Sequence, residues 1–233
     1  MAVSSGRLDL DHFSNECSGT VIKCGSAVRD LAIGDRVYAL SKSKYGNRMR
    51  SPAGFAQKMS ANHAFHQTAS LPIVFATAIY GLRYLGNLVR NEKVLIQSAT
   101  GGLGLAAIQI ARDAGAEIFA TVGSAAKKKY LIENQNIPET HIAVVASRDL
   151  DRSVEPITFF PEITFDVVLN TGSGRILEES LRKLNAGGRL ADVGRVDVQN
   201  HGVLHMATFQ KNASFASFDL NVLMDYNPDV CSR

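Results

Sequence analysis

The sequence predicts an α/β fold in which a doubly wound parallel sheet follows a smaller domain made mostly of β-strands. From residue 92 onward, unbroken apolar runs alternate with stretches of helical character, which is typical of a parallel sheet covered by helices on both faces. A glycine-rich loop joins the first of these strands to the first of these helices. Before residue 70 the chain instead shows short strand signals separated by turns.

The first part of the chain yields three candidate strands, at residues 20–23, 36–40 and 54–60. Residues 33–36 form a turn signal between the first two, and residues 41–53 are polar and loop-like. A helical segment is predicted over residues 71–84, because Pro72 suits the first turn of a helix. We therefore assign residues 1–70 to the small domain.

The second part predicts strands at residues 94–97, 118–122, 142–145, 165–170 and 189–193, with a sixth candidate at 214–219. Helices are predicted between them at residues 103–114, 125–134 and 174–185. These elements define a domain over residues 71–220, after which residues 221–233 are expected to return to the small domain.

The stretch from Lys93 to Gly104 carries the strongest signal for a ligand. An apolar strand runs into a loop with three glycines and then into a helix, which is the setting of a dinucleotide-binding fingerprint in a Rossmann fold. Such glycines allow a pyrophosphate to approach the helix N-terminus closely. An ordinary strand-to-helix turn is the alternative. The predicted cofactor-binding residues are Ala99, which stands at the usual first glycine, and Thr100, Gly101, Gly102, Leu103 and Gly104.

The end of the second strand bears on which dinucleotide is bound. NAD-binding units carry Asp or Glu about 20 residues beyond the loop, where it bonds the ribose 2′-hydroxyl. Here the strand ends at Val122 and Gly123, and Ser124 and Lys127 follow. Small polar and cationic groups suit a 2′-phosphate, so NADPH is predicted rather than NADH. The alternative is that Lys127 and the two lysines after it form the solvated face of the next helix.

Composition restricts the function classes. The 233 residues are 45% hydrophobic, and 25 basic against 22 acidic residues give a net charge of +3, which is too weak for a nucleic-acid binder. The three cysteines favour a reducing compartment. Residues 1–7 show no apolar core of signal-peptide length, and no apolar run approaches membrane-spanning length. We expect a soluble, cytoplasmic protein. One basic stretch reads as a solvated loop or, alternatively, as a docking surface for an acidic partner: Lys42, Lys44, Arg48, Arg50 and Lys58.

No metal site is predicted. A structural zinc site needs four closely spaced Cys or His ligands, and a catalytic site needs three and a water. Cys17 and Cys24 have no third ligand near them in sequence, and nothing completes a set with His63 and His66.

Several motifs in combination resemble one family. They are Glu-Cys-Ser-Gly at 16–19, Gly-Asp-Arg-Val at 34–37, the segments 69–78, 94–104, 107–111 and 119–124, and Phe-Asp-Val-Val-Leu-Asn at 165–170. Over residues 13–220 the chain resembles the zinc-free medium-chain reductases, and looks most like the enoyl reductase domain of fungal highly reducing polyketide synthases. Animal fatty-acid synthase and quinone oxidoreductases are more distant relatives in this resemblance. The resemblance implies a GroES-like small domain before the Rossmann domain.

The resemblance also implies a chemistry. NADPH would deliver hydride to the β-carbon of an α,β-unsaturated acyl thioester held on an acyl carrier protein, and the α-carbon would then be protonated. The partners implied are that carrier, the rest of a polyketide synthase and a second copy in a homodimer. In zinc-dependent relatives a His precedes the Glu of the first motif, whereas this chain has Asn15 there.

Candidate catalytic residues follow from the same resemblance. The segment from Val193 to Asp197 resembles the family's Ile-Gly-Lys-x-Asp, which makes Asp197 a candidate proton donor beside the nicotinamide. Arg195, in the same segment, is a further candidate catalytic residue. Arg175 lies nearest to the position of a catalytic Lys in relatives. A guanidinium there could polarise the substrate but would be a poor proton donor. A turn or cap role is the alternative for Asp197. The implied cofactor set also includes Arg148, Asn170 and Gly194.

The chain departs from the family in three places. It begins just past an Asn-Phe-Arg-Asp segment, stops before the elements that close the substrate domain, and lacks the usual Thr-x-Gly-x-Gly-Val within residues 149–164. An incomplete catalytic half is therefore expected. Two alternative functions stay open, a free-standing quinone or alkenal oxidoreductase and a non-catalytic remnant that binds nucleotide or nothing.

Overall fold

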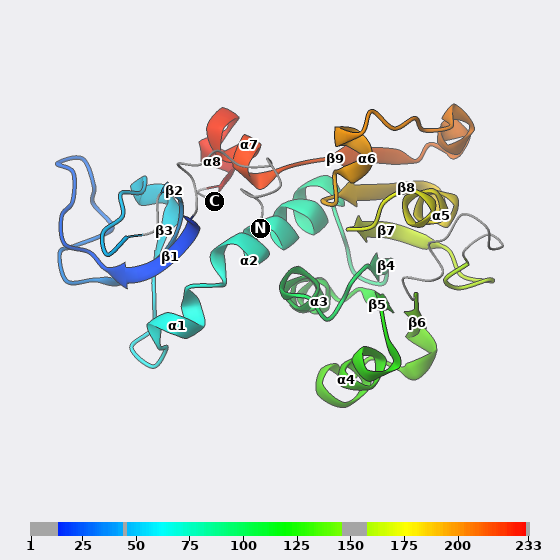
Figure 1. Ribbon diagram of the computed structural model, residues 1–233, viewed down its shortest axis with the longest axis horizontal. Helices are drawn as coiled ribbons and strands as arrows, with labels where there is room; N and C mark the ends of the chain where they lie inside the picture. Colours follow the sequence, from blue (N-terminus) through cyan, green and yellow to red (C-terminus); the bar gives the residue numbers. More distant parts are fainter. Residues whose placement is uncertain (1–13, 44–45, 146–157, 232–233) are drawn as a thin grey trace. The chain divides into compact units, whose positions relative to one another are not determined.

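The structure is a computed structural model of the 233-residue chain, and it describes residues 14–43, 46–145 and 158–231. Its contacts divide the chain into two compact units (Figure 1). Unit 1 comprises Met1–Ala76 and Leu220–Arg233, and unit 2 comprises Thr77–Asp219. The domain limits 1–70, 71–220 and 221–233 stay a prediction.

Unit 1 is built on a three-stranded antiparallel sheet in the order β1-β2-β3. Its elements are β1 (Ser14–Thr20), β2 (Arg36–Ser43), β3 (Ala56–Lys58), the 3₁₀ turn Ala53–Phe55, α1 (Phe65–Thr68), α7 (Leu220–Tyr226), α8 (Pro228–Cys231) and the first residues of α2 (Pro72–Ile79), whose last three residues belong to unit 2. Leu40 of β2 packs with Leu220 and Met224 of α7, so an early strand and a late helix of the chain share one apolar cluster.

Glu16 joins β1 to the beginning of α2. Its carboxylate accepts a hydrogen bond of 2.9 Å from the backbone N–H of Ile73. Burial raises the pKa of Glu16 above its usual value, and the Ile73 N–H opposes that rise.

The first predicted strand is wrong. The strand is β1, Ser14–Thr20, and it ends where the predicted strand 20–23 begins. β1 is small and polar and mostly half-buried, so it lacks the apolar alternation on which the prediction relied. Val21 instead exchanges backbone hydrogen bonds with the turn at Gly34 and Asp35, at 2.8 and 2.9 Å. The predicted strand 54–60 is reduced to the three residues of β3.

Unit 2 confirms the predicted doubly wound parallel sheet. Its six strands are all parallel and lie in the order β6-β5-β4-β7-β8-β9. The strands are β4 (Lys93–Ile96), β5 (Glu117–Val122), β6 (Ile142–Val144), β7 (Phe165–Asn170), β8 (Leu184–Asp192) and β9 (Ser214–Ser217). The helices are the π-helix Tyr80–Leu85, α3 (Gly102–Ala114), α4 (Ala125–Gln135), α5 (Arg175–Arg182), α6 (Val196–Gln199) and the 3₁₀ helices Glu139–His141 and Met206–Lys211.

The strand order reverses between β4 and β7. The chain adds β5 and β6 on one side of β4, and then β7, β8 and β9 on the other. Figure 1 shows α3 on one side of the sheet and α5 on the other. In open α/β sheets, ligands bind at such a reversal, beyond the carboxyl ends of the strands.

The strand predictions in unit 2 succeed because the strands are buried on both faces. Val94, Leu95, Val167 and Val168, in the two central strands, are all 0% exposed. Burial on both faces selects continuous apolar runs, which are easily recognised in the sequence. On one side the core is completed by edge-to-face contacts among Phe119, Phe160 and Phe165, with ring centroids 5.3–5.7 Å apart.

Two helix boundaries differ from the prediction. The segment 71–84 is not one α-helix, because α2 ends at Ile79 and continues as the π-helix Tyr80–Leu85. α5 ends at Arg182 rather than at residue 185, and β8 begins at once, at Leu184.

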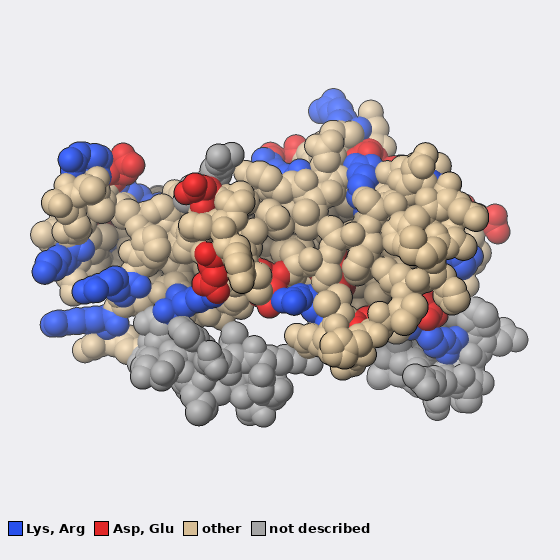
Figure 2. All heavy atoms as spheres, turned by 90° about the horizontal axis from the view of Figure 1, so that it is seen from above, with Lys and Arg blue, Asp and Glu red and all other residues tan. Residues whose placement is uncertain are grey.

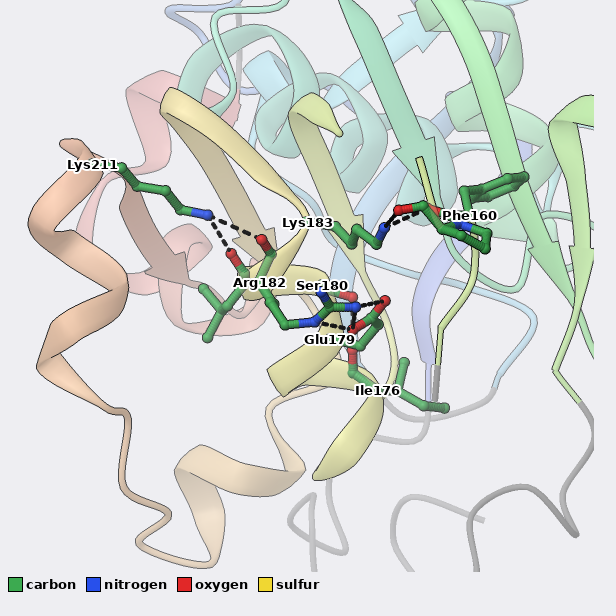
Figure 3. A network of polar contacts seen from close by, with 9 residues as sticks. Phe160, Ile176, Glu179, Ser180, Arg182, Lys183 and Lys211 are labelled. Carbon is green, nitrogen blue, oxygen red and sulfur yellow. Dashed lines mark hydrogen bonds and ion pairs between the residues drawn. The ribbon is translucent and has the colours of Figure 1, made fainter. Parts of the chain in front are cut away.

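Two lysines bind backbone carbonyls around the end of α5, and one of them, Lys211, caps the last carbonyls of the helix (Figure 3). Lys183 is 3% exposed, and its Nζ donates to the carbonyl oxygens of Phe160 and Pro161. Lys211 donates to the carbonyls of Leu181, Arg182 and Leu184 at 2.7–3.1 Å. Cations at a helix C-terminus satisfy its last carbonyls and the helix dipole. Burial, and secondarily the charge of Arg182, lowers the pKa of Lys211.

Lys183→Met is expected to lower the free energy of unfolding by about 3 kcal/mol, because it leaves two carbonyls without their charged donor. Urea denaturation checks this value. The control is Lys129→Met, since Lys129 is exposed and, among the described residues, forms an ion pair with Glu133 alone, at 3.6 Å one turn along α4. Equal losses in the two variants would show that the buried contacts of Lys183 contribute nothing beyond a surface pair.

Candidate functional site

The loop after β4 ends at an open helix N-terminus. Gly101 caps α3 in extended backbone conformation, and no side chain within the described residues bonds to the first turn. Gly101 and Gly102 are both exposed. The first N–H groups of a helix have no partner inside the helix and carry a partial positive charge. This end of α3 can therefore receive an anion such as a phosphate.

Gly104 brings α3 into direct contact with the loop. A Cβ at this position would lie 2.5 Å from Cα and 2.6 Å from the carbonyl oxygen of Ala99. Ala99 is fully buried, and its N–H bonds to the carbonyl of Thr121 on β5 at 3.0 Å. Helix and loop can meet this closely only at a glycine, which is the role of the third glycine in a dinucleotide fingerprint.

The end of β5 carries the two residues predicted to choose the cofactor. Ser124 is the N-cap of α4, and its hydroxyl accepts a hydrogen bond of 3.4 Å from the N–H of Lys127. Lys127 is exposed and forms no ion pair within the described part of the chain. The next two lysines pair with acidic residues, Lys128 with Glu139 and Lys129 with Glu133. Lys127 is thus the cation of this helix turn that is available for a ligand.

Asn170 ends β7 in a fully buried position. Its Nδ2 donates to the carbonyl of Gly172 at 2.8 Å and to the carboxylate of Asp192 at 2.7 Å. Its Oδ1 is buried and has no hydrogen-bond partner among the described residues. A buried polar atom without a partner is costly, so this oxygen marks a place where a ligand donor would be favourable.

The loop after β8 holds the candidate acid. Both carboxylate oxygens of Asp197, in α6, accept from the backbone N–H of Gly174, at 3.1 and 2.9 Å. Arg195 caps α6 with a φ of 56° and pairs with Asp219 at 2.6 Å. Arg175 is the half-buried first residue of α5.

The backbone also approaches closely at Gly194, where a Cβ would lie 2.8 Å from the carbonyl oxygen of Thr171. The structure therefore brings the carboxyl ends of the neighbouring parallel strands β4, β7 and β8 together at one side of the sheet.

Of the predicted residues, Arg148 lies outside the described part of the chain.

Three polar residues at this edge were not predicted. Gln97 and Ser98 follow β4, and Thr171 follows β7. Thr171 donates its hydroxyl hydrogen to Ser98 Oγ at 3.0 Å, and its N–H bonds to Gln97 Oε1 at 3.1 Å. The signal that could have found them is position alone, since each directly follows a strand next to the reversal of strand order.

The basic stretch at residues 42–58 is partly neutralised. Lys42 pairs with Asp225 of α7, and Lys58 pairs with Asp35 at 2.9 Å. Figure 2 shows acidic side chains beside some of the basic ones on this unit. Lys44 lies outside the described residues.

Across residues 14–43, 46–145 and 158–231, no three His, Cys, Asp or Glu side chains are placed to hold a metal ion. The described residues therefore do not fit a zinc site. No helix in the same ranges is long and apolar enough to cross a membrane.

Comparison with known proteins connects this architecture to one family. The family described as "Zinc-binding dehydrogenase" matches residues 102–228. Prosolanapyrone synthase of Alternaria solani is 44% identical over 225 residues, which cover 97% of this chain and 8% of that protein. The highly reducing polyketide synthase xilA of Penicillium crustosum is 41% identical over 230 residues, covering 99% and 9%. The chain thus spans about a tenth of the length of these relatives.

Solved structures agree with these relatives. The CurK enoyl reductase superposes with a TM-score of 0.76 at 32% identity, over 93% of this chain and 63% of that one. The nucleotide-binding subdomain of the enoylreductase domain of PpsC from Mycobacterium tuberculosis gives 0.58 at 34% identity, over 69% and 87%. The resemblance inferred from the sequence is confirmed, and the chain belongs to the zinc-binding dehydrogenase family, among the enoyl reductase domains of polyketide synthases.

Proposed function

We propose that this chain is an NADPH-dependent oxidoreductase that reduces an α,β-unsaturated acyl thioester carried by an acyl carrier protein. The observation that carries the proposal is the open N-terminus of α3, held against Ala99 by Gly104 at the reversal of strand order. The relatives named polyketide synthases support a place within such a synthase. The proposal includes a cytoplasmic setting and a homodimer.

The residues present fit a dinucleotide along the edge of the sheet. Gly101 and Gly102 would receive the pyrophosphate, and Ser124 and Lys127 would lie at the 2′-phosphate. The unpartnered Oδ1 of Asn170 and the close approach at Gly194 mark the opposite end, next to the candidate acid. When bound there, NADPH would supply the hydride.

The chain's own residues would then manage the proton and the substrate carbonyl. Asp197 is proposed to protonate the α-carbon, and its carboxyl group is held in place by the N–H of Gly174. Arg175 is proposed to orient the thioester carbonyl or the phosphopantetheine, since a guanidinium does not give up its proton. Arg195, held by Asp219, would add positive charge at the same loop.

Cofactor choice provides a direct test. NADPH is expected to bind more tightly than NADH, and Lys127→Glu is expected to weaken NADPH about tenfold, because a carboxylate would repel the 2′-phosphate. NADH affinity should not change. Fluorescence titration measures all four constants. Lys129→Glu is the control, with the same charge change on the same helix. Equal affinities of the wild type for NADPH and NADH would refute the 2′-phosphate argument.

The substrate class needs a separate assay. With NADPH present, the chain is expected to reduce a crotonyl thioester and not a quinone. Turnover of the quinone alone would replace the proposal with a quinone or alkenal oxidoreductase. Absence of nucleotide binding in every titration would leave a non-catalytic remnant.

A further inference from the structure

Gln97 is a buried amide at the carboxyl end of β4. It is 2% exposed, yet all of its polar atoms are used. Its Oε1 accepts from the N–H groups of Thr171, at 3.1 Å, and Gly172, at 2.8 Å. Its Nε2 donates to Ser180 Oγ at 2.5 Å. A side chain from one strand therefore fixes two consecutive backbone amides in the loop that follows the neighbouring strand.

Ser180 links this contact to α5. Its hydroxyl donates to the carbonyl of Ile176, one turn earlier in the helix, at 2.7 Å (Figure 3). Gly172 packs against the side chains of Ile176 and Gln97, since a Cβ there would lie 2.4 Å from Ile176 Cγ2 and 3.0 Å from Gln97 Oε1. The loop of residues 171–174 is thus held between Gln97 and the first turn of α5.

This loop contacts both neighbouring loops of the proposed site. Thr171 bonds to Ser98 in the loop after β4, and its carbonyl lies against Gly194 in the loop after β8. At its end, the N–H of Gly174 holds the carboxylate of Asp197. A shift at residues 171 and 172 would therefore displace the backbone beside Asn170 and the candidate acid together.

We infer that Gln97 is a positioning residue, which sets the loop of residues 171–174 and, through that loop, the nicotinamide end of the cofactor site. A methionine would fill the same volume without polar atoms that need partners. What the amide adds is the orientation of two N–H groups. The part of the inference that concerns the cofactor rests on the proposed function, whereas the part that concerns the loop does not.

The test compares Gln97→Met, which removes every hydrogen bond of the side chain, with Gln97→Glu, which keeps the two acceptor bonds to the loop. Amide hydrogen exchange at residues 171 and 172 is expected to accelerate at least about tenfold in Gln97→Met and no more than about threefold in Gln97→Glu, which loses only the bond from Nε2 to Ser180. The amides of β5 should exchange at the same rate in all three proteins.

Binding gives the second readout. NADPH is expected to bind about tenfold more weakly to Gln97→Met, whereas adenosine 2′,5′-bisphosphate, which lacks the nicotinamide half, should bind as it does to the wild type. Gln97→Glu should restore NADPH binding. Equal weakening of both ligands would mean a general loss of structure and would overturn the inference. So would unchanged exchange at residues 171 and 172.

If the wild type binds neither ligand, the proposed function fails, and the exchange rates still decide whether Gln97 sets the loop. Ser180→Ala covers the case in which Gln97→Met does not fold. It removes only the partner of Nε2 and should accelerate exchange at residues 171 and 172 about threefold. No acceleration there would count against the inference.

Discussion

Gly104→Val is expected to abolish nucleotide binding and to unfold the sheet domain at lower urea concentration. The added Cβ alone would lie 2.5 Å from Ala99 Cα, and Ala99 cannot retreat because it is buried and bonded to β5. α3 must therefore move away from the sheet, which costs about 3 kcal/mol or more. Fluorescence titration with NADPH and urea denaturation measure the two effects.

Gly101→Val is the matched control for this variant. The nearest atom to a Cβ at Gly101 is the carbonyl oxygen of Ser98, at 3.3 Å, so the fold should survive. The new side chain would still stand at the exposed N-terminus of α3, and NADPH should bind about a hundredfold more weakly or not at all. A folded Gly101→Val that binds NADPH normally would show that the loop is an ordinary turn.

Asp197→Asn is expected to slow thioester reduction by ~10²–10⁴-fold while leaving NADPH affinity nearly unchanged. The asparagine Oδ1 can still accept from the N–H of Gly174, so the contact between α6 and the start of α5 is kept and only the proton donor is lost. Steady-state kinetics with a crotonyl thioester, combined with NADPH titration, separates the two effects.

Two further variants control this experiment. Glu178→Gln removes an exposed carboxyl group from the first turn of α5, and it should leave the rate unchanged. Arg175→Ala should instead raise the KM for the thioester, as expected of a group that orients substrate. Full activity in Asp197→Asn would assign protonation to solvent or to another residue.

The sheet was predictable and the small unit was less so, for the same physical reason. Strands such as β7, with Val167, Val168 and Leu169 fully buried, are apolar on both faces and appear as unbroken runs. β1 is polar and half-buried, and its place is set by pairing with β2, which no local pattern encodes. The early end of α5 depends on Lys211, which lies far along the chain.

The site was predictable at the level of strand ends only. The glycine loop, Asn170 and Asp197 follow from patterns next to each strand, so their common edge could be inferred. The hydrogen-bond partners of the site residues could not be inferred. Gln97 reads as the last residue of a strand, and the three groups that it bonds lie more than seventy positions later in the chain. Similarly, nothing near Asp197 in sequence indicates a bond to Gly174.

The reversal of strand order also determines when the sheet can be completed while the chain is being synthesised. β4 pairs with β5 through residues 93–96 and 117–120, but its other edge pairs with residues 167–169. A nascent chain that has left the ribosome only as far as β6 therefore holds a half-sheet whose β4 edge is apolar and open. Such edges favour pairing with other chains. We therefore expect the long-range pairing of β4 with β7 to be a slow step in the folding of this domain, and Gln97 gains its partners only once β7 and α5 are in place.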